Sequence, residues 1–283
     1  MTDPAKTGNP DNPAAFPNTD RKSRAMNRLF LIGTGPGAVS LIPPLATEAI
    51  AASTDIVAYG LYFDFLGDLV TQKTCHALSL GEETERARLA LNLAAEGRPT
   101  ALLSSGDIGI FAMGAVVFEL LDHQLQGREN HPEWMEVEIE VIPGISAMQA
   151  NASAAGALLG HDFCAISLSD LLTPWHVIEK RIHAAGAGDF VVSFYNPVSK
   201  RRNWQLDSAR RILLEYRPGN TPVVLGRNLT RHDQSQEIIE LGDLDAGTVD
   251  MFTCVSVGNR ESRHILNGQK AWVYTPRGYS KKQ

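Results

Sequence analysis

The stretch Ser104-Ser-Gly-Asp-Ile-Gly-Ile-Phe111 decides the fold class of this 283-residue chain. It follows the apolar run Thr100–Leu103 and precedes a helical pattern over Ala112–Leu125. A short apolar run, a glycine turn and a long amphipathic pattern are typical of a parallel α/β sheet. Such sheets bind ligands at the carboxyl ends of their strands, so the stretch predicts a site loop.

Residue types within this loop support two interpretations. Gly106 and Gly109 lack a Cβ, so the backbone can turn sharply and approach a small molecule, while Asp107 offers a carboxylate. A Gly-Asp pair between a strand and a helix also serves as a plain turn with an N-cap. The loop alone leaves both interpretations open.

Composition bounds the class of protein. The length suits two domains, and 43% hydrophobic and 20% charged residues are typical of a soluble globular protein. The formal net charge of -6 argues against a general nucleic-acid binder. No uninterrupted apolar run approaches the roughly 18 residues of a membrane span. We therefore expect neither nucleic acid nor membrane as a partner.

The cysteines indicate the cellular compartment, and the first 27 residues indicate where the folded part begins. Cys75, Cys164 and Cys254 are far apart and form no Cys-x-x-Cys pair, which argues against a disulfide framework and a metal site and favours the cytoplasm. Each suits a small core residue better than a nucleophile. Residues 1–27 carry several prolines and no apolar signal core, so they predict a disordered tail.

Further apolar runs predict a chain of alternating strands and helices. The second half contains late strands without intervening helices, which favours a mixed α/β sheet there. We expect strands at 28–32, 55–59, 100–103, 137–142, 163–168, 190–194, 222–225, 237–241 and 251–257, and helices from near 43, at 82–96, 112–125, 147–155, 175–185 and 203–215.

Gly33-Thr-Gly-Pro-Gly37 follows the first predicted strand, as a dinucleotide-binding loop would. The spacing does not fit, because the sixth position is Ala38 and Pro36 removes a backbone donor. Asp55, the acid available for a ribose, precedes its strand instead of ending it. A nicotinamide-dependent oxidoreductase is therefore the weaker alternative.

Taken together, the loops resemble the tetrapyrrole methylase family from about Arg28 to Tyr279. The motifs that carry the resemblance are Gly33-Thr-Gly-Pro-Gly37, Ser105-Gly-Asp-Ile-Gly-Ile-Phe111, Val141-Ile-Pro-Gly-Ile-Ser-Ala147, Gly160-His-Asp-Phe-Cys-Ala-Ile-Ser-Leu-Ser-Asp170, Tyr195-Asn-Pro197 and Thr275-Pro-Arg-Gly-Tyr279. The resemblance implies two α/β domains, 28–143 and 144–283, each an α/β sandwich, with the active-site cleft between them. It also implies a homodimer.

The activity that the resemblance implies is transfer of a methyl group from S-adenosylmethionine to ring carbon 17 of precorrin-3B. Contraction of the ring to precorrin-4 accompanies it, in aerobic cobalamin biosynthesis. One alternative is the same methylation of cobalt-factor III in the anaerobic route. The other is a tetrapyrrole-binding protein without catalysis.

The resemblance also assigns binding residues. The methyl donor is expected at Gly106, Asp107, Ile108, Phe111, Ser146, Ala147, Tyr195, Asn196, Arg227, Asn228, Thr253 and Cys254, and the tetrapyrrole at Gly35, Pro36 and Gly37. Ile108 and Phe111 depart from the proline and tyrosine common in the family. Ser146 equally suits the N-cap of the helix that follows it.

Ring contraction requires proton transfer, so we expect Asp107, His161 and Asp170 to surround that part of the ring. A loop histidine bonded to the backbone is the alternative for His161. The substrate carries several carboxylates, which arginine pairs in bidentate fashion. Lys200, Arg201 and Arg202 are the first candidates, Arg227 and Arg231 the second; Lys200 also suits a solvated helix start.

Overall fold

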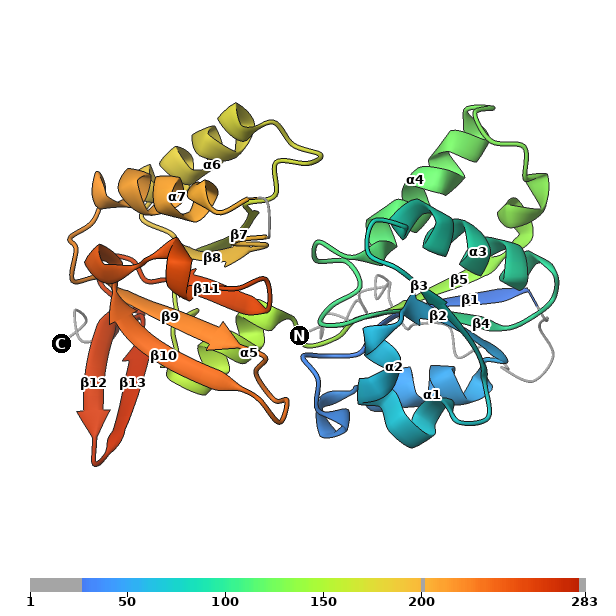
Figure 1. Cartoon of the computed structure of the whole chain (residues 1–283), viewed down its shortest axis with the longest axis horizontal. Coiled ribbons are helices and arrows are strands. Elements are labelled where there is room, and N and C mark those ends of the chain that lie inside the picture. Colours follow the sequence, from blue (N-terminus) through green and yellow to red (C-terminus); the bar gives the residue numbers. More distant parts are fainter. Residues whose placement is uncertain (1–26, 200–201, 280–283) are drawn as a thin grey trace, which may run out of the picture.

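The computed structural model describes residues 27–199 and 202–279. Figure 1 shows two lobes, each built around a sheet with helices on its faces. The predicted tail at 1–27 lies outside the described residues except for Asn27.

The first lobe, called the N-lobe, has a five-stranded sheet in the order β3-β2-β4-β1-β5, with every pair parallel. Helices α1 and α2 pack on one face of this sheet and α3 and α4 on the other (Figure 1). The elements are β1 Arg28–Gly33, α1 Pro44–Ala52, β2 Asp55–Tyr59, α2 Leu61–Leu66, β3 Thr74–Leu78, α3 Glu83–Ala95, β4 Thr100–Ser104, α4 Met113–Leu125 and β5 Glu138–Ile142.

The second lobe, called the C-lobe, has a five-stranded sheet in the order β10-β9-β11-β8-β7 and a smaller sheet β12-β13-β6. Only β7 and β8 are parallel in the larger sheet, so the predicted mixed sheet is confirmed. The elements are α5 Ala147–Ala155, β6 Gly156–Ala157, β7 Phe163–Ser167, α6 Trp175–Ala187, β8 Val191–Tyr195, α7 Trp204–Leu214, β9 Pro222–Arg227, β10 Ser235–Glu240, β11 Thr253–Val257, β12 Arg263–Asn267 and β13 Lys270–Tyr274.

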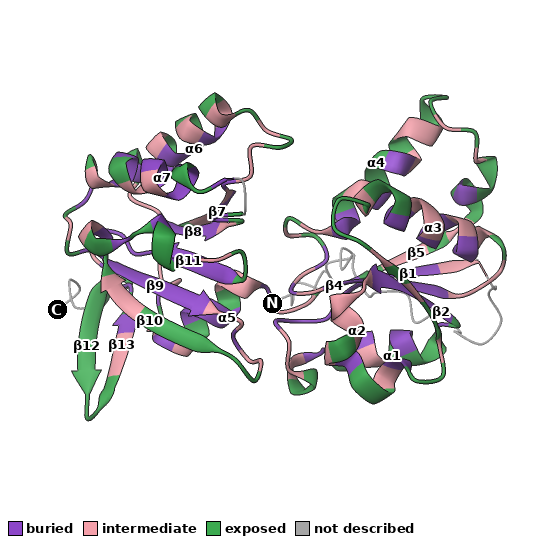
Figure 2. Ribbon diagram, in the orientation of Figure 1, coloured by how far each residue is buried: buried purple, intermediate pink, exposed green. Residues whose placement is uncertain are grey.

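Burial explains why these segments form strands and helices. Central strands β4 and β11 are buried throughout, including the threonine and serine residues that each contains (Figure 2). Helix α3 buries Ala87, Ala90, Leu91 and Ala94, which recur at helical spacing and face the sheet. The hydrophobic cores therefore lie between the sheets and their helices, and the loops at the strand ends are left for a site.

Asp55 has a structural role. Its side chain is 1% exposed and accepts hydrogen bonds from Arg98 and from His76, the latter at 2.8 Å. An aspartate committed to these partners is not available to a ribose, which agrees with the low rank given to dinucleotide binding.

The first sheet ends at Ile142 and α5 begins at Ala147, so the predicted domain division at 143 falls in the link between the two lobes. The division itself stays a prediction. Within the described ranges, no helix has the length and apolar character that crossing a bilayer demands.

Candidate active site

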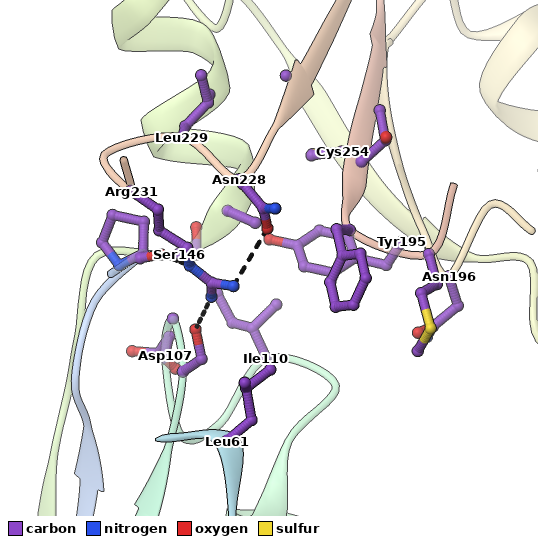
Figure 3. Close-up of a pocket in the computed structure, with 18 of the residues that line it drawn as sticks. Leu61, Asp107, Ile110, Ser146, Tyr195, Asn196, Asn228, Leu229, Arg231 and Cys254 are labelled. Atoms are coloured by element: carbon purple, nitrogen blue, oxygen red, sulfur yellow. Dashed lines mark hydrogen bonds between the residues drawn. The ribbon is translucent and has the colours of Figure 1, made fainter. Parts of the chain in front are cut away.

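A cavity of about 360 Å³ lies between the two lobes. The N-lobe contributes the ends of strands and the loops after them, and the C-lobe contributes the start of α5 and loops beside β8, β9 and β11 (Figure 3). The lining includes Pro36, Tyr59, Leu61, Tyr62, Leu80, Ser105, Gly106, Asp107 and Ile110 on the first side, and Ser146, Ala147, Phe194, Tyr195, Asn196, Gly226, Asn228, Leu229, Arg231, Met251, Phe252, Thr253 and Cys254 on the second.

Three glycines allow the N-lobe loops to cross at the base of the cavity. Gly35 and Gly106 exchange backbone hydrogen bonds of 3.0 and 2.7 Å. A Cβ on Gly144 would lie 2.2 Å from the Gly106 carbonyl oxygen, which no side chain can accommodate. Because the backbones touch here, glycine is required for packing as well as for turning.

Asp107 satisfies both interpretations of its loop. One carboxylate oxygen accepts from the Gly109 N–H at 2.8 Å, and the other accepts from the Gly144 N–H at 3.0 Å. The same residue lines the cavity. It is therefore a turn-stabilising residue whose charge also faces a ligand site.

The amino end of α5 borders the cavity on the C-lobe side. Ser146 and Gln149 form a capping box, in which the Gln149 side chain accepts from the Ser146 N–H at 2.9 Å, so the predicted N-cap is confirmed. The Tyr195 hydroxyl accepts from the Met148 N–H at 3.1 Å. Burial raises the pKa of the Tyr195 phenol, so this hydroxyl stays protonated at neutral pH.

Cys254 lies in the buried lining of the cavity. Burial raises the pKa of its thiol to about 12, which rules out a thiolate nucleophile near neutral pH. Its carbonyl oxygen accepts from the Asn151 side chain at 3.1 Å, which ties β11 to α5. Cys254 therefore shapes the cavity and is not a reactive group.

Most of the residues predicted to contact the methyl donor line this cavity, but three do not. Ile108 is 1% exposed and packs in the N-lobe core. Phe111 is exposed, and its ring centroid lies 5.1 Å from that of Tyr195. Arg227 donates to Asp250 at 2.6 Å and Asp233 at 3.2 Å, so its charge is already paired. The side chains of these three residues do not line the cavity, and their contact with the methyl donor stays a prediction.

The three predicted catalytic residues do not gather in the cavity, because only Asp107 lines it. The His161 ring accepts from the Asp162 N–H at 2.8 Å, close to the alternative of a loop histidine held by the backbone. Asp170 accepts from the Gln205 side chain at 3.0 Å and lies 3.8 Å from Arg202. Catalytic roles for His161 and Asp170 stay predictions.

Of the three first candidates for substrate cations, the structure describes Arg202. Lys200 and Arg201 lie outside the described residues. Arg202 is 9% exposed and donates to the carbonyl oxygens of Leu168 and Asn196, at 2.9 and 2.7 Å. Its guanidinium holds two loops together, and a role for Arg202 in substrate binding stays a prediction.

Among Gly35, Pro36 and Gly37, only Pro36 lines the cavity, and tetrapyrrole binding by all three stays a prediction. Sequence reasoning missed Tyr59 at the end of β2, and Leu61 and Tyr62 at the start of α2. The rule that ligands bind at the carboxyl ends of parallel strands could have found them. Arg231 also lines the cavity, although the sequence placed it only among the second candidates for substrate-binding cations.

Comparison with known proteins defines the class to which this fold and site belong. The model of the Tetrapyrrole (Corrin/Porphyrin) Methylases matches residues 28–245, and the chain belongs to this family. It is 43% identical over 253 residues to a precorrin-3B C(17)-methyltransferase of Sinorhizobium sp, covering 89% of this chain and 97% of the relative. It is 40% identical over 252 residues to a probable cobalt-factor III C(17)-methyltransferase of Salmonella typhimurium, covering 89% and 99%.

The crystal structure of the methyltransferase CobJ superposes with a TM-score of 0.80 at 42% identity, over 88% of this chain and 99% of that one. The two-domain α/β fold implied by the family resemblance is therefore confirmed.

Proposed function

We propose that this protein transfers a methyl group from S-adenosylmethionine to ring carbon 17 of precorrin-3B and contracts the ring to precorrin-4, in aerobic cobalamin biosynthesis. The observation that carries the proposal is the 43% identity to a precorrin-3B C(17)-methyltransferase over nearly the whole of both chains. The cavity between the lobes supports it, because methyl transfer needs two reactants aligned in a closed site. Such alignment can supply about 7–11 kcal/mol of the barrier reduction.

The cavity fits the methyl donor in size and chemistry. Its volume of about 360 Å³ falls in the range of small-molecule sites, roughly 300–1,000 Å³. Leu229, Met251 and Phe252 provide apolar surface, and the backbone of the Gly106 loop can approach closely. When bound, S-adenosylmethionine supplies the electrophilic methyl group. The Asp107 carboxylate adds negative charge beside a cationic ligand, and no thiolate competes for the methyl group.

Asp107 is also the residue that we propose for proton transfer in ring contraction. It is the carboxylate among the three predicted catalytic residues that lines the cavity, and two backbone N–H groups fix its orientation. A fixed carboxylate can accept a proton from a substrate hydroxyl without losing its position.

Cobalt-factor III is the second candidate substrate. The relative from Salmonella typhimurium is 40% identical over a similar length, so overall identity separates the two substrates weakly. A binding protein without catalysis is the candidate from another functional class. Turnover decides between these possibilities.

The test is anaerobic incubation of the protein with S-adenosylmethionine and either precorrin-3B or cobalt-factor III. Mass spectrometry and the absorption spectrum then report methylation and ring contraction. A one-methyl gain on precorrin-3B with a contracted-ring spectrum supports the proposal. Gain only on the cobalt form moves the protein to the anaerobic route, and donor binding without any gain supports a carrier.

We further infer a cytoplasmic homodimer. The family resemblance supports the dimer, and the unpaired cysteines suit a reducing compartment. Light scattering after size-exclusion chromatography tests the assembly: a mass of one chain would contradict it.

A further inference from the structure

Arg231 reaches from the C-lobe into the N-lobe. It lies in the loop between β9 and β10, and its Nε donates to the Pro36 carbonyl oxygen at 3.0 Å, 195 residues away in sequence. Its Nη2 donates to the Ser105 hydroxyl at 3.2 Å, and the guanidinium carbon lies 4.2 Å from the centre of the Phe65 ring. One side chain therefore contacts three separate segments of the other lobe.

The loops that meet here pack closely. A Cβ on Gly37 would lie 2.5 Å from Cγ of Arg231, so the arginine stem occupies the space that the glycine leaves. Next to this contact, the Ala38 N–H donates to the Thr230 hydroxyl at 3.1 Å. The position of the Arg231 guanidinium is thus fixed from both lobes, at the edge of the cavity that it lines (Figure 3).

Arg231 forms no close ion pair with a described side chain, and the nearby Asp233 carboxylate, which acts on its charge, is itself bonded to Arg227 and Asn228. Within the described ranges no carboxylate lies within 4.0 Å of it, whereas Arg227 on the same loop pairs with both Asp250 and Asp233. Asn228 accepts a third hydrogen bond from Arg231, at 3.2 Å. An arginine has five N–H donors, so two remain for a ligand. A half-buried guanidinium without a directly bonded carboxylate favours an anionic ligand.

We propose that Arg231 is the carboxylate receptor of the cleft, binding an acidic group of the ligand while it ties the two lobes together. The inference rests on the proposed function, which offers two sources of this chemistry. One is a side-chain carboxylate of the tetrapyrrole, and the other is the α-carboxylate of the methyl donor.

The experiment compares Arg231→Gln and Arg231→Lys with the full-length protein. The control is Arg263→Gln, which removes the same charge from an exposed position on β12. Calorimetry measures the binding affinity for S-adenosylhomocysteine and for S-adenosyl-3-thiopropylamine, which is the same compound without its carboxylate. Anaerobic absorption titration measures the binding affinity for precorrin-3B in the absence of a methyl donor. Melting temperatures show whether each variant is folded.

We expect Arg231→Gln to weaken one carboxylate-bearing ligand about 10- to 100-fold, the usual loss for a charge-assisted bidentate pair. Arg231→Lys, which keeps the charge but not the fork, should fall between this variant and the wild type. Weakened precorrin-3B binding alone identifies the tetrapyrrole as the source. Weakened S-adenosylhomocysteine binding with unchanged binding of the decarboxylated compound identifies the methyl donor.

If folded Arg231→Gln binds all three ligands within twofold of the wild-type affinities, the proposal that Arg231 is a carboxylate receptor is overturned. Equal weakening of both adenosyl compounds, with precorrin-3B unaffected, would also overturn it, because the effect would then not depend on a carboxylate. Wild-type turnover of precorrin-3B is measured separately, so loss of the receptor leaves the proposed function standing. If the wild-type protein binds none of the three ligands, both the receptor proposal and the proposed function are contradicted.

Discussion

The Asp107 carboxylate accepts a hydrogen bond from the Gly144 N–H at 3.0 Å and so joins the loop after β4 to the loop after β5. The residue proposed for chemistry thereby also holds the base of the cavity together. Variants at this position must separate the two roles.

Asp107→Asn and Asp107→Ala should do so. Asparagine keeps one acceptor oxygen but presents an amide NH2 group where the second N–H needs an acceptor, and alanine removes both acceptors. We expect a stability loss of about 1 kcal/mol for Asn and about 2 kcal/mol for Ala, measured by urea unfolding. If the charge serves the reaction, turnover should fall at least tenfold in both variants. The decrease in Asp107→Asn should persist at temperatures where this variant is fully folded.

Asp245→Ala is the matched control, since Asp245 accepts from the Gly247 N–H at 2.8 Å in an exposed turn away from the cavity. It should lose a similar or smaller stability with unchanged turnover. Normal turnover in Asp107→Asn would contradict the catalytic role and leave the structural one.

The crossing of the glycine loops predicts a severe effect at Gly144. In Gly144→Ala the new methyl group would lie 2.2 Å from the Gly106 oxygen and 2.6 Å from Gly33, so two loops must separate. We expect a loss of about 3 kcal/mol in unfolding free energy. In Gly219→Ala the nearest atom would be 3.9 Å away, and stability should stay near that of the wild type. Equal stabilities of the two variants would contradict the crossing.

The pKa of Asp55 predicts how stability depends on pH. Burial raises this pKa, but hydrogen bonds from His76, Thr54 and Arg98 outweigh burial, and the net pKa lies below its usual value. A depressed carboxyl pKa stabilises the fold above the unfolded-state pKa, and this contribution is lost as pH falls through the folded-state pKa. Asp55→Asn should therefore cost about 2 kcal/mol at pH 7.

The stability difference between Asp55→Asn and the wild type should shrink as pH falls below about 4, where the wild-type aspartate also becomes neutral. Urea unfolding at several pH values measures it. A difference that is constant down to the acid limit would mean that the lost contacts are not charge-dependent.

The sequence predicted the elements that are buried and continuous, and missed those whose pattern is weak. β1, β4 and the helices α3 and α4 were found because their apolar spacing is set by the core. β3 was missed because it is a sheet edge on which no residue is fully buried. All five residues of β12 are exposed, so it also lacked a signal.

The roles of site residues could be predicted when their contacts are with nearby backbone in the same loop. They could not be predicted when the contacts join loops that are distant in sequence. Ser146 was recognised from its cap position. Nothing local to Arg202 indicates that the Leu168 and Asn196 carbonyls need its donors. The contact of Arg231 with Pro36 likewise depends on how two lobes meet, which no sequence period encodes.

Tyr195 offers a final prediction about the edge of α5. In Tyr195→Phe the Met148 N–H loses its acceptor while the ring keeps its contact with Phe111, so stability should fall by about 1 kcal/mol. Tyr216→Phe removes a comparable hydroxyl, 3.0 Å from the His183 ring, away from the cavity. Both should lose similar stability, but only Tyr195→Phe should weaken S-adenosylhomocysteine binding, measured by calorimetry.

The raised pKa of Tyr195 adds a pH test. A phenol whose pKa is higher in the folded state contributes stability below its unfolded-state pKa of about 10, and this contribution is lost as pH rises above that value. Between pH 7 and 9 the hydroxyl stays neutral, so the ratio of wild-type to Tyr195→Phe affinities should not change. A ratio that falls across this range would show that the phenol ionises there, and the hydroxyl could then no longer be treated as a permanently neutral partner of the α5 amino end.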